Sequence, residues 1–500
     1  MSTQNPLILA FTFAVYFAVV WMIGWYAYRR TRDLSDFILG GRRLGSGVAA
    51  LSAGASDMSG WLLLGLPGFA YAAGLESIWL AGGLLLGTWA NWRLVAARLR
   101  VFSMSYGNAL TLPEYFANRF DDRAGWLRGI AALFILLFFL LYTSAGLVAG
   151  GKLFQSVFGL PYVWAVAIGV LSIMVYTAVG GFLAVSWTDV LQGILMAVAL
   201  VAVPLVALSQ IGDTRLALEV IEAANPNLLD PFTRADGSAL GLIGILSLAA
   251  WGLGYFGQPH ILARFQAIAS PRKVPMARWI AVTWVAVTLA GATLTGLAGI
   301  LIIEQPLAPE ARETVFILLV DLLFHPLIAG LLLAAILAAI MSTADSQLLV
   351  SSSTFTEDLY RTLLRRKAGA RELVAVGRIT VVVISVAAFW LALDPDAMVL
   401  DLVAYAWAGF GAAFGPALVL SLYWPRMTGL GALAGILVGG LTVLGWRQLQ
   451  GGLFDLYEIV PGILFATLAI VLASRADTKK HEGLAARFTK VEAELKATSS

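Results

Sequence analysis

A single carboxylate, Asp57, lies within a long apolar run that extends from about Val48 to Ala73. Because a bare carboxylate in hydrocarbon costs several kcal/mol, an acidic residue at such a position indicates a functional site. Gly54 and Gly60 flank Asp57 and, together with the small residues between them, weaken the helix at that point. Transporters bind cations where a helix is broken at membrane depth. The segment therefore predicts a cation site on an interrupted membrane helix.

The composition is typical of a membrane protein with many spans. Of the 500 residues, 60% are hydrophobic and only 13% are charged, and the mean hydropathy is +0.84; soluble chains carry about 25% charge. The sequence has no cysteine and only three histidines, which argues against disulfides, cysteine nucleophiles and histidine-rich metal sites. The net charge of +3 argues against a nucleic-acid partner. No basic segment precedes the first apolar run, so we expect a membrane span there rather than a cleaved signal peptide.

The lengths of the apolar runs predict thirteen membrane-spanning helices, because about 20 apolar residues cross a bilayer. The expected spans are residues 6–28, 46–74, 77–97, 127–153, 161–182, 187–210, 240–258, 278–303, 315–344, 374–393, 398–423, 428–449 and 455–474.

The basic residues predict the orientation of these spans. With the N-terminus outside, the cytoplasmic segments hold 28 of the 33 basic residues and the outside holds five. Since basic residues concentrate on the cytoplasmic side, we expect the N-terminus outside and the C-terminus in the cytoplasm. The outer loop, residues 211–239, should form short surface helices. The cytoplasmic tail, residues 476–500, can form a helix from Leu484 to Leu495.

Two interrupted spans at matching positions indicate an inverted repeat within one transmembrane domain, residues 1–475. The second span is interrupted at Ala53–Gly60, and the seventh, five spans later, at Gly252–Pro259. Because five is odd, the halves 46–210 and 240–423 would run in opposite directions, and such repeats place a substrate site at the midplane between their broken helices. The alternative is that these glycines serve helix packing, as in many membrane helices.

Six segments carry a resemblance to a known family of transporters. They are Ile38–Arg42 (ILGGR), Ser52–Trp61 (SAGASDMSGW), Gly180–Asp189 (GGFLAVSWTD), Trp251–Phe265 (WGLGYFGQPHILARF), Ala338–Thr343 (AAIMST) and Tyr405–Pro416 (YAWAGFGAAFGP). From about residue 7 to 475 the chain resembles the sodium/solute symporter family, and most of all its sodium/proline symporters. The resemblance implies an all-α membrane protein with a leucine-transporter-type 5+5 inverted repeat, one extra N-terminal helix and two extra C-terminal helices.

The resemblance also implies a sodium site. Sodium is a hard cation and prefers oxygen ligands. The family's ligand positions correspond to backbone oxygens of the second and ninth spans and to two hydroxyls, at Ala55, Met58, Ala339, Ser342 and Thr343. Asp57 matches the family's essential carboxylate nearby. The alternative for the two hydroxyls is that they bond back to their own helix.

Three further polar residues are candidates for a second sodium site, which some relatives have: Asp189, Asp345 and Ser346. Asp345 stands where sodium/proline symporters have a small hydroxyl residue. The alternative is that Asp345 lies near the cytoplasmic end, pairs with a basic loop residue and lines the exit. Arg42 is expected to gate the inner vestibule, with a role as orientation signal as the alternative.

The substrate pocket implied by the resemblance suits a small zwitterion with an apolar ring. Its expected residues surround the two interruptions: Ser59, Gly60, Trp61, Tyr142, Trp251, Tyr255 and Pro259. A half-helix beginning beyond Gly60 can accept a carboxylate at its positive end, and an indole face can support an ammonium group. The alternative for the aromatic residues is anchoring at the membrane interface.

The function implied by the resemblance is sodium-coupled import of L-proline by alternating access across a prokaryotic inner membrane. Sodium is the expected co-transported ion, the lipid bilayer is the expected environment, and no obligate protein partner is expected. The first alternative is a symporter of the same family for another amino acid, a sugar or a carboxylate. A sensor is disfavoured because residues 476–500 are too few for a signalling domain. An enzyme is disfavoured because no nucleophile pairs with a base, and no phosphate-binding glycine loop supports an ATP-driven pump.

Overall fold

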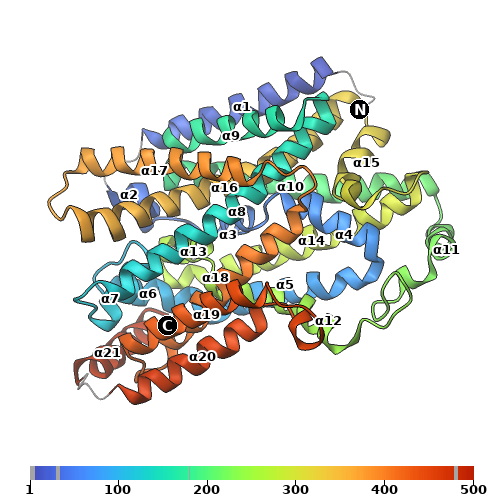
Figure 1. Cartoon of the computed structure of the whole chain (residues 1–500). Coiled ribbons are helices and arrows are strands. Elements are labelled where there is room, and N and C mark those ends of the chain that lie inside the picture. Colours follow the sequence, from blue (N-terminus) through green and yellow to red (C-terminus); the bar gives the residue numbers. More distant parts are fainter. Residues whose placement is uncertain (1–5, 30–33, 180, 478–481, 500) are drawn as a thin grey trace.

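The computed structural model of this chain is all helical. It describes residues 6–29, 34–179, 181–477 and 482–499, and across these ranges the only β contacts are two isolated bridges. The first residue of the Gly180–Asp189 motif lies outside them. Figure 1 shows the helices, which are α1 (Pro6–Tyr28), α2 (Leu34–Leu39), α3 (Ser46–Asp57), α4 (Leu66–Ala73), α5 (Ile78–Asn91), α6 (Ala97–Ser105), α7 (Leu112–Phe120), α8 (Trp126–Phe158), α9 (Tyr162–Val179), α10 (Phe182–Ile211), α11 (Thr214–Ala224), α12 (Gly241–Ala249), α13 (Pro259–Ala267), α14 (Val274–Ile302), α15 (Val315–Leu323), α16 (Pro326–Ser353), α17 (Ala370–Leu391), α18 (Val399–Tyr423), α19 (Gly429–Trp446), α20 (Ile459–Ala476) and α21 (Glu482–Ser499).

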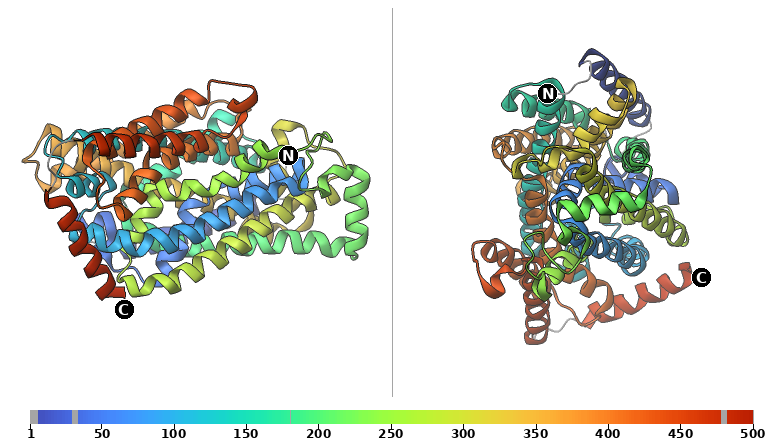
Figure 2. Two further views of the ribbon diagram at one scale, coloured as in Figure 1. Left: turned by 90° about the horizontal axis from the view of Figure 1, so that it is seen from below. Right: turned by 90° about the vertical axis from the view of Figure 1, so that its right-hand side faces the viewer.

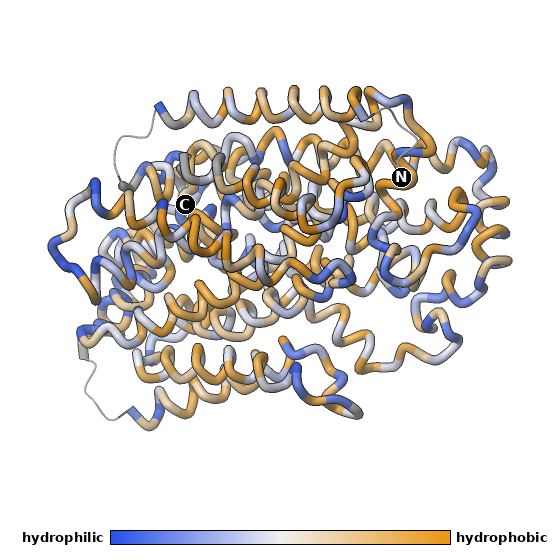
Figure 3. Tube along the Cα trace, turned by 45° about the horizontal axis from the view of Figure 1, so that its top comes forward, coloured by the Kyte–Doolittle hydropathy of each residue, from blue (hydrophilic) through white to orange (hydrophobic). Residues whose placement is uncertain are grey.

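The long helices lie side by side in one elongated bundle, with short helices and loops at its two ends (Figures 1 and 2). One end, called the α21 end, carries α6, α7 and α21, and the opposite end carries α11 and α15 (Figure 1). Figure 3 shows hydrophobic residues along the helices and hydrophilic residues concentrated at the two ends. Large apolar side chains such as Trp164, Trp279 and Trp390 are exposed on the bundle. A surface of this kind suits a lipid bilayer, in which helices satisfy their own backbone groups.

Ten helices are long and apolar enough to cross a membrane, or eleven if the bent pair Gly241–Gly257 and Pro259–Ala267 is one span. The described residues thus give fewer spans than the thirteen predicted. Two predicted spans fall within one apolar stretch, Trp61–Ser105, in which the chain turns at Gly74 (φ 60°). Another appears only as a shorter apolar helix, Tyr162–Met174. The multi-span helical architecture is confirmed, whereas the number of crossings stays a prediction.

The predicted span 315–344 has the wrong boundaries. The chain leaves α15 at Leu323, and α16 starts at Pro326. Between them His325 is extended (φ −60°, ψ 143°), because the residue before a proline is disfavoured in helical geometry. The apolar character continues across this corner, so composition alone does not reveal it.

The helices predicted outside the spans are present. The loop 211–239 contains α11 and a short 3-10 turn, Pro226–Leu229. The tail forms α21, which includes the predicted segment Leu484–Leu495. These elements lie at opposite ends of the bundle (Figure 1).

Both predicted interruptions lie inside the bundle. α3 ends at Asp57, and helical geometry resumes at Gly60 in a π-helical turn that leads into α4. In the second interruption α12 passes into a 3-10 segment, Ala250–Gly257, followed by a 48° bend before α13. α3 packs against α10, α13, α14 and α16. The freed backbone is therefore surrounded by protein, which is the condition under which broken helices are tolerated at membrane depth.

Glycines at the second interruption also serve close packing. A Cβ atom on Gly252 would lie 2.0 Å from the Gly83 carbonyl of α5, and one on Gly87 would lie 2.2 Å from the Gly252 carbonyl. The packing alternative therefore applies to these glycines. The break itself is marked by Pro259 and by the extended residue before it, Gln258 (φ −80°, ψ 105°).

Candidate functional site

Asp57 is the last helical residue of α3, and it is almost completely buried. The next residue, Met58, leaves helical geometry (φ −82°, ψ 79°), although its N–H still donates to the Gly54 carbonyl. The Asp57 carbonyl accepts hydrogen bonds from the Tyr142 hydroxyl at 3.2 Å and from the Trp61 indole N–H at 3.3 Å. Two predicted pocket side chains thus satisfy backbone that the break exposes.

One hydrogen bond joins the two breaks. The hydroxyl of Tyr255, in the second break, donates to Asp57 Oδ2 at 2.6 Å. The other carboxylate oxygen, Oδ1, is buried and has no hydrogen-bond partner within the described residues. Because an unpartnered buried polar group costs about 1–3 kcal/mol, this oxygen is available to a donor or a cation.

Aromatic rings form a continuous wall along the second break. The rings of Trp61 and Trp251 lie 6.2 Å apart, and Tyr457 stacks on Trp251 at 5.7 Å. Trp407 meets Tyr255 edge-on at 5.0 Å and donates its indole N–H to the Trp251 carbonyl at 2.7 Å. Stacked and edge-on pairs add stability beyond their buried area, so these rings hold one another in place.

The other predicted pocket residues lie directly at the breaks. Ser59 and Gly60 connect α3 to the π-helical turn, and Pro259 is the first residue of α13. A Cβ atom on Gly60 would lie 2.6 Å from the Cβ of Ala149 on α8, so a side chain does not fit there. The structure therefore brings all seven predicted pocket residues to the two breaks: Ser59, Gly60, Trp61, Tyr142, Trp251, Tyr255 and Pro259.

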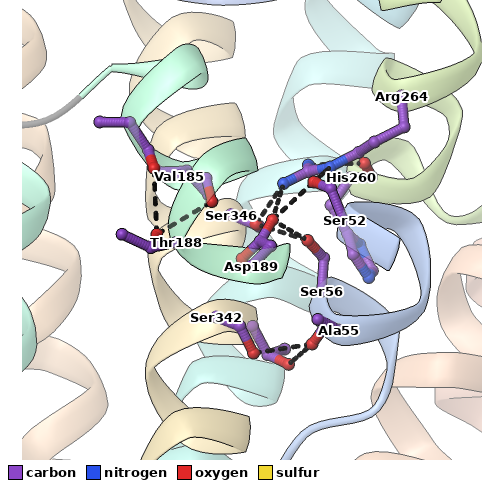
Figure 4. A network of polar contacts seen from close by, with 12 residues as sticks. Ser52, Ala55, Ser56, Val185, Thr188, Asp189, His260, Arg264, Ser342 and Ser346 are labelled. Carbon is purple, nitrogen blue, oxygen red and sulfur yellow. Dashed lines mark hydrogen bonds and ion pairs between the residues drawn. The ribbon is translucent and has the colours of Figure 1, made fainter. Parts of the chain in front are cut away.

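Oxygen atoms of α3 and α16 converge beside the first break (Figure 4). Ser342 Oγ lies 2.7 Å from the Ala55 carbonyl and 3.1 Å from the Ala339 carbonyl, and Thr343 Oγ1 lies 3.4 Å from the Ala55 carbonyl. Ser342 has one hydrogen and can donate to only one carbonyl at a time. Such an uncharged oxygen cluster suits a hard cation. Met58, the fifth predicted ligand, lies at the break and takes no part in these hydrogen bonds.

A second polar cluster centres on Asp189 of α10, which is fully buried (Figure 4). Its Oδ2 accepts hydrogen bonds from Ser52 at 2.6 Å, from Ser56 at 3.1 Å and from the Arg264 guanidinium at 3.2 Å. The same guanidinium nitrogen donates to Ser346 Oγ at 2.6 Å. A protein cation therefore lies between two of the residues expected to hold a second sodium ion.

The side chain of Asp345, the third of those residues, forms no hydrogen bond with this cluster within the described residues. Its Oδ1 is 2.5 Å from Thr177 Oγ1 of α9, and its Oδ2 has no hydrogen-bond partner in the described part of the chain. The structure thus links Asp189 with Ser346 through Arg264, whereas the Asp345 side chain is hydrogen-bonded to Thr177 instead.

Arg42 ties together three segments at the α21 end. Its guanidinium donates to Asn108 Oδ1 and Ser103 Oγ, both at 3.0 Å, and to the carbonyls of Ala109 (2.7 Å) and Gln266 (2.8 Å). Burial lowers the pKa of Arg42 to about 10, so the group stays charged at neutral pH. This arrangement joins the segment before α3 to α6, to the loop that follows α6 and to α13.

Four residues of the site are absent from the sequence-based set. Arg264 belongs to the Trp251–Phe265 motif, but nothing in the sequence indicates its complete burial against Asp189. Trp407 belongs to the Tyr405–Pro416 motif, but its contact with Tyr255 forms only because α18 packs against the second break. Tyr457 is part of the aromatic wall, and His260 lies 6.1 Å from the Tyr142 ring with both ring nitrogens buried and without a partner among the described residues.

Comparison with known proteins identifies the family to which this chain belongs. The family model described as the sodium:solute symporter family matches residues 37–439. The sodium/proline symporter of Salmonella typhimurium is 49% identical over 498 residues, which cover 99% of this chain and 97% of that protein. The osmoregulated proline transporter of Bacillus subtilis is 48% identical over 92% of this chain and 93% of that protein.

Among solved structures, a Na⁺-coupled sialic acid symporter in a substrate-bound outward-open state has a TM-score of 0.77 at 21% identity. The match covers 94% of this chain and 98% of that chain. It confirms the predicted leucine-transporter-type fold. Because the family model covers most of the chain and relatives match it at nearly half of their positions along almost its full length, this multi-pass membrane protein belongs to the sodium:solute symporter family.

Proposed function

We propose that this protein is a sodium-coupled symporter that imports L-proline. The relatives that match nearly all of the chain are named as sodium/proline symporters or proline transporters. The structural observation that carries the proposal is the Tyr255–Asp57 hydrogen bond, which joins two broken helices where all seven pocket residues gather. Like these relatives, the chain is a transporter, and it moves its substrate without chemical change.

Sodium binds, in this proposal, among the oxygens of Ala55, Met58, Ala339, Ser342 and Thr343. When the ion is present, the two hydroxyls turn their lone pairs toward it instead of donating to the carbonyls. Asp57 lies beside these ligands and attracts the cation electrostatically, while its bond to Tyr255 passes the change to the second break. The bound ion thereby completes the pocket.

L-Proline binds between the two breaks. Its carboxylate is drawn to the positive end of the half-helix that starts after Gly60. Its secondary ammonium faces the indole ring of Trp61 or Trp251, where a cation–π attraction is available. Its apolar ring packs against Tyr142 and Pro259.

The two ends of the bundle act as alternating gates. Arg42 and its partners hold the α21 end closed. The second set of contacts centres on Glu313. Lys152 Nζ lies 2.8 Å from its carboxylate, which also accepts hydrogen bonds from the N–H groups of Val399 and Leu400 at the start of α18. Opening one set of contacts while the other stays closed moves both solutes inward. One sodium charge crossing the membrane gains about 2.3 kcal/mol per 100 mV.

The orientation and domain limits are part of the proposal. The protein lies in a bacterial inner membrane with its N-terminus outside and its C-terminus in the cytoplasm, as the distribution of basic residues favours. Residues 46–210 and 240–423 form the inverted repeats of one transporter domain, residues 1–475. Residues 476–500 form a cytoplasmic tail.

The test is uptake of radiolabelled L-proline into proteoliposomes with and without an inward sodium gradient. We expect uptake that depends on sodium and is lost in Asp57→Ala. Uptake that ignores sodium would refute the coupling. Sodium-dependent uptake of another amino acid, a sugar or a carboxylate in place of proline would refute the substrate and retain the family.

A further inference from the structure

A cavity of about 770 Å³ lies at the α21 end, away from the two breaks. It is bounded by α21, by the turn between α6 and α7, by the segment before α8 and by the segment that follows α16. Figure 1 shows α6, α7 and α21 close together at this end, and Figure 2 shows α21 there as well. The orientation proposed above places the cavity on the cytoplasmic side.

The carboxylates that line this cavity already have partners. Asp121 pairs with Arg123 at 3.2 Å. Asp122 accepts hydrogen bonds from the backbone N–H groups of Gly125 and Arg128, both at 3.0 Å. The remaining carboxylate, on α21, is Glu494, which accepts from the Ser105 hydroxyl at 2.8 Å.

Three basic side chains that line the cavity have no such partner. Arg366, Arg487 and Lys490 form no ion pair with any described carboxylate. Arg487 and Lys490 belong to α21, whereas Arg366 lies between α16 and α17. The cavity thus has an excess of unpaired positive charge contributed by separate segments.

Two buried polar groups are also unsatisfied: one lines the cavity, and the other lies against the ring of the first. Tyr106 lines the cavity, is 5% exposed, and its hydroxyl has no hydrogen-bond partner in the part of the chain described. Behind it, the Arg119 guanidinium lies 5.4 Å from the Tyr106 ring and 5.2 Å from the Phe488 ring of α21. Both terminal nitrogens of Arg119 lack partners among the described groups. Burial raises the pKa of Tyr106, and the nearby charges of Arg119 and Arg487 offset part of this increase.

We propose that this cavity binds a phosphate-bearing anion, either a phospholipid headgroup or a soluble phosphate compound. Arginine and lysine donors with a tyrosine hydroxyl match the chemistry of phosphate oxygens, and arginine suits them through its forked donors. A phosphate here offsets the buried charge of Arg119 and fixes α21 against α6. α6 carries Ser103, which is one of the partners of Arg42, so the ligand stabilises the closed state of this end.

The test uses the lack of cysteine in the chain. A single cysteine at Ala124→Cys, an exposed residue that lines the cavity, is labelled with a charged maleimide in neutral detergent, without proline or sodium. We expect pyrophosphate to slow labelling at least tenfold. The double variant Arg487→Gln/Lys490→Gln should lose this protection. The control Arg475→Gln/Lys496→Gln removes two exposed charges outside the cavity and should keep it.

Lipid nanodiscs distinguish the two sources of phosphate. Protection in discs that contain phosphatidylglycerol, but not in phosphatidylcholine discs, identifies a headgroup; protection only by added pyrophosphate identifies a soluble ligand. Absence of protection by both probes overturns the proposal, as does protection that persists in the double variant. Size-exclusion profiles confirm that each variant is folded, and the outcome is independent of the uptake test because no substrate is present.

Discussion

The hydroxyl of Tyr255 donates a 2.6 Å hydrogen bond to the carboxylate of Asp57, 198 positions away in the sequence. This bond is a direct polar link between the side chains of the two breaks. A cation that attracts the Asp57 carboxylate therefore also acts on the segment that carries Trp251 and Pro259. The geometry offers a short route by which sodium binding alters the proline pocket.

Removing this link tests that route. We expect Tyr255→Phe to raise the half-saturating sodium concentration for proline uptake about tenfold or more, because a hydrogen bond to a charged group contributes about 1.5–3 kcal/mol. The control is Tyr162→Phe, which loses a hydroxyl bonded to the Ala392 carbonyl at 3.0 Å. An unchanged sodium dependence in Tyr255→Phe would show that the bond does not couple the two sites.

The hydroxyl of Ser342 makes the shortest contact in the oxygen cluster, at 2.7 Å from the Ala55 carbonyl. We expect Ser342→Ala to raise the half-saturating sodium concentration about tenfold while uptake at saturating sodium persists, because one ligand is lost and the pocket stays intact. Sodium titration of proline uptake measures this. Ser353→Ala, on the same helix, serves as the control because it removes a hydroxyl that, among the described residues, bonds back to the Leu349 carbonyl. Equal behaviour of both variants would place the ion elsewhere.

The buried pair of Asp189 and Arg264 should contribute to the stability of the fold. Arg264→Gln leaves the Asp189 charge in the interior without a cation, and breaking such a pair costs about 3–5 kcal/mol. We expect a clear loss in the thermal unfolding midpoint of the purified protein. Arg272→Gln, at an exposed position of the following turn, should leave the midpoint unchanged. A stable Arg264→Gln protein would mean that water or an ion replaces the guanidinium.

The same pair predicts the number of coupled ions. Because the guanidinium of Arg264 already lies between Asp189 and Ser346, we expect one sodium ion per proline. Parallel uptake of ²²Na⁺ and labelled proline into proteoliposomes measures the ratio. A ratio of two would require Arg264 to move aside when sodium binds.

Arg42 predicts the accessibility of the α21 end. We expect Arg42→Gln to speed maleimide labelling of a cysteine at Ala263→Cys about tenfold, because four hydrogen bonds that hold this end closed are lost. Arg43→Gln is the control, since the Arg43 side chain is 60% exposed and, within the described residues, its ion pair is with Asp36. Equal labelling rates in the two variants would contradict a gating role.

Much of the fold follows from the sequence because its signals are local. Glycine, proline and a lone carboxylate mark the two breaks within apolar runs, and the structure places both where they were predicted. The tail helix and the surface helix of the loop 211–239 follow in the same way. The corner at Pro326 was hidden because apolar residues continue on both sides of it.

The polar contacts could not be predicted to the same extent because they join distant parts of the chain. Arg264 and Asp189 are 75 positions apart and come from different helices. An arginine near the end of an apolar run has the same local pattern whether it faces the cytoplasm or a buried carboxylate. The same holds for Trp407, whose ring reaches Tyr255 only after α18 has packed on the second break.

The guanidinium of Arg264 also bears on the return of the empty carrier. After sodium and substrate leave, a transporter must cross back without cargo, and an uncompensated interior carboxylate would oppose that step. Asp189 keeps a counter-charge in the empty carrier as long as its ion pair with Arg264 holds, because Arg264 does not leave with the cargo. We therefore expect the unloaded protein to reset with little electrostatic penalty at Asp189, whereas the Asp57 carboxylate is compensated by sodium in the loaded carrier and loses that compensation in the empty one.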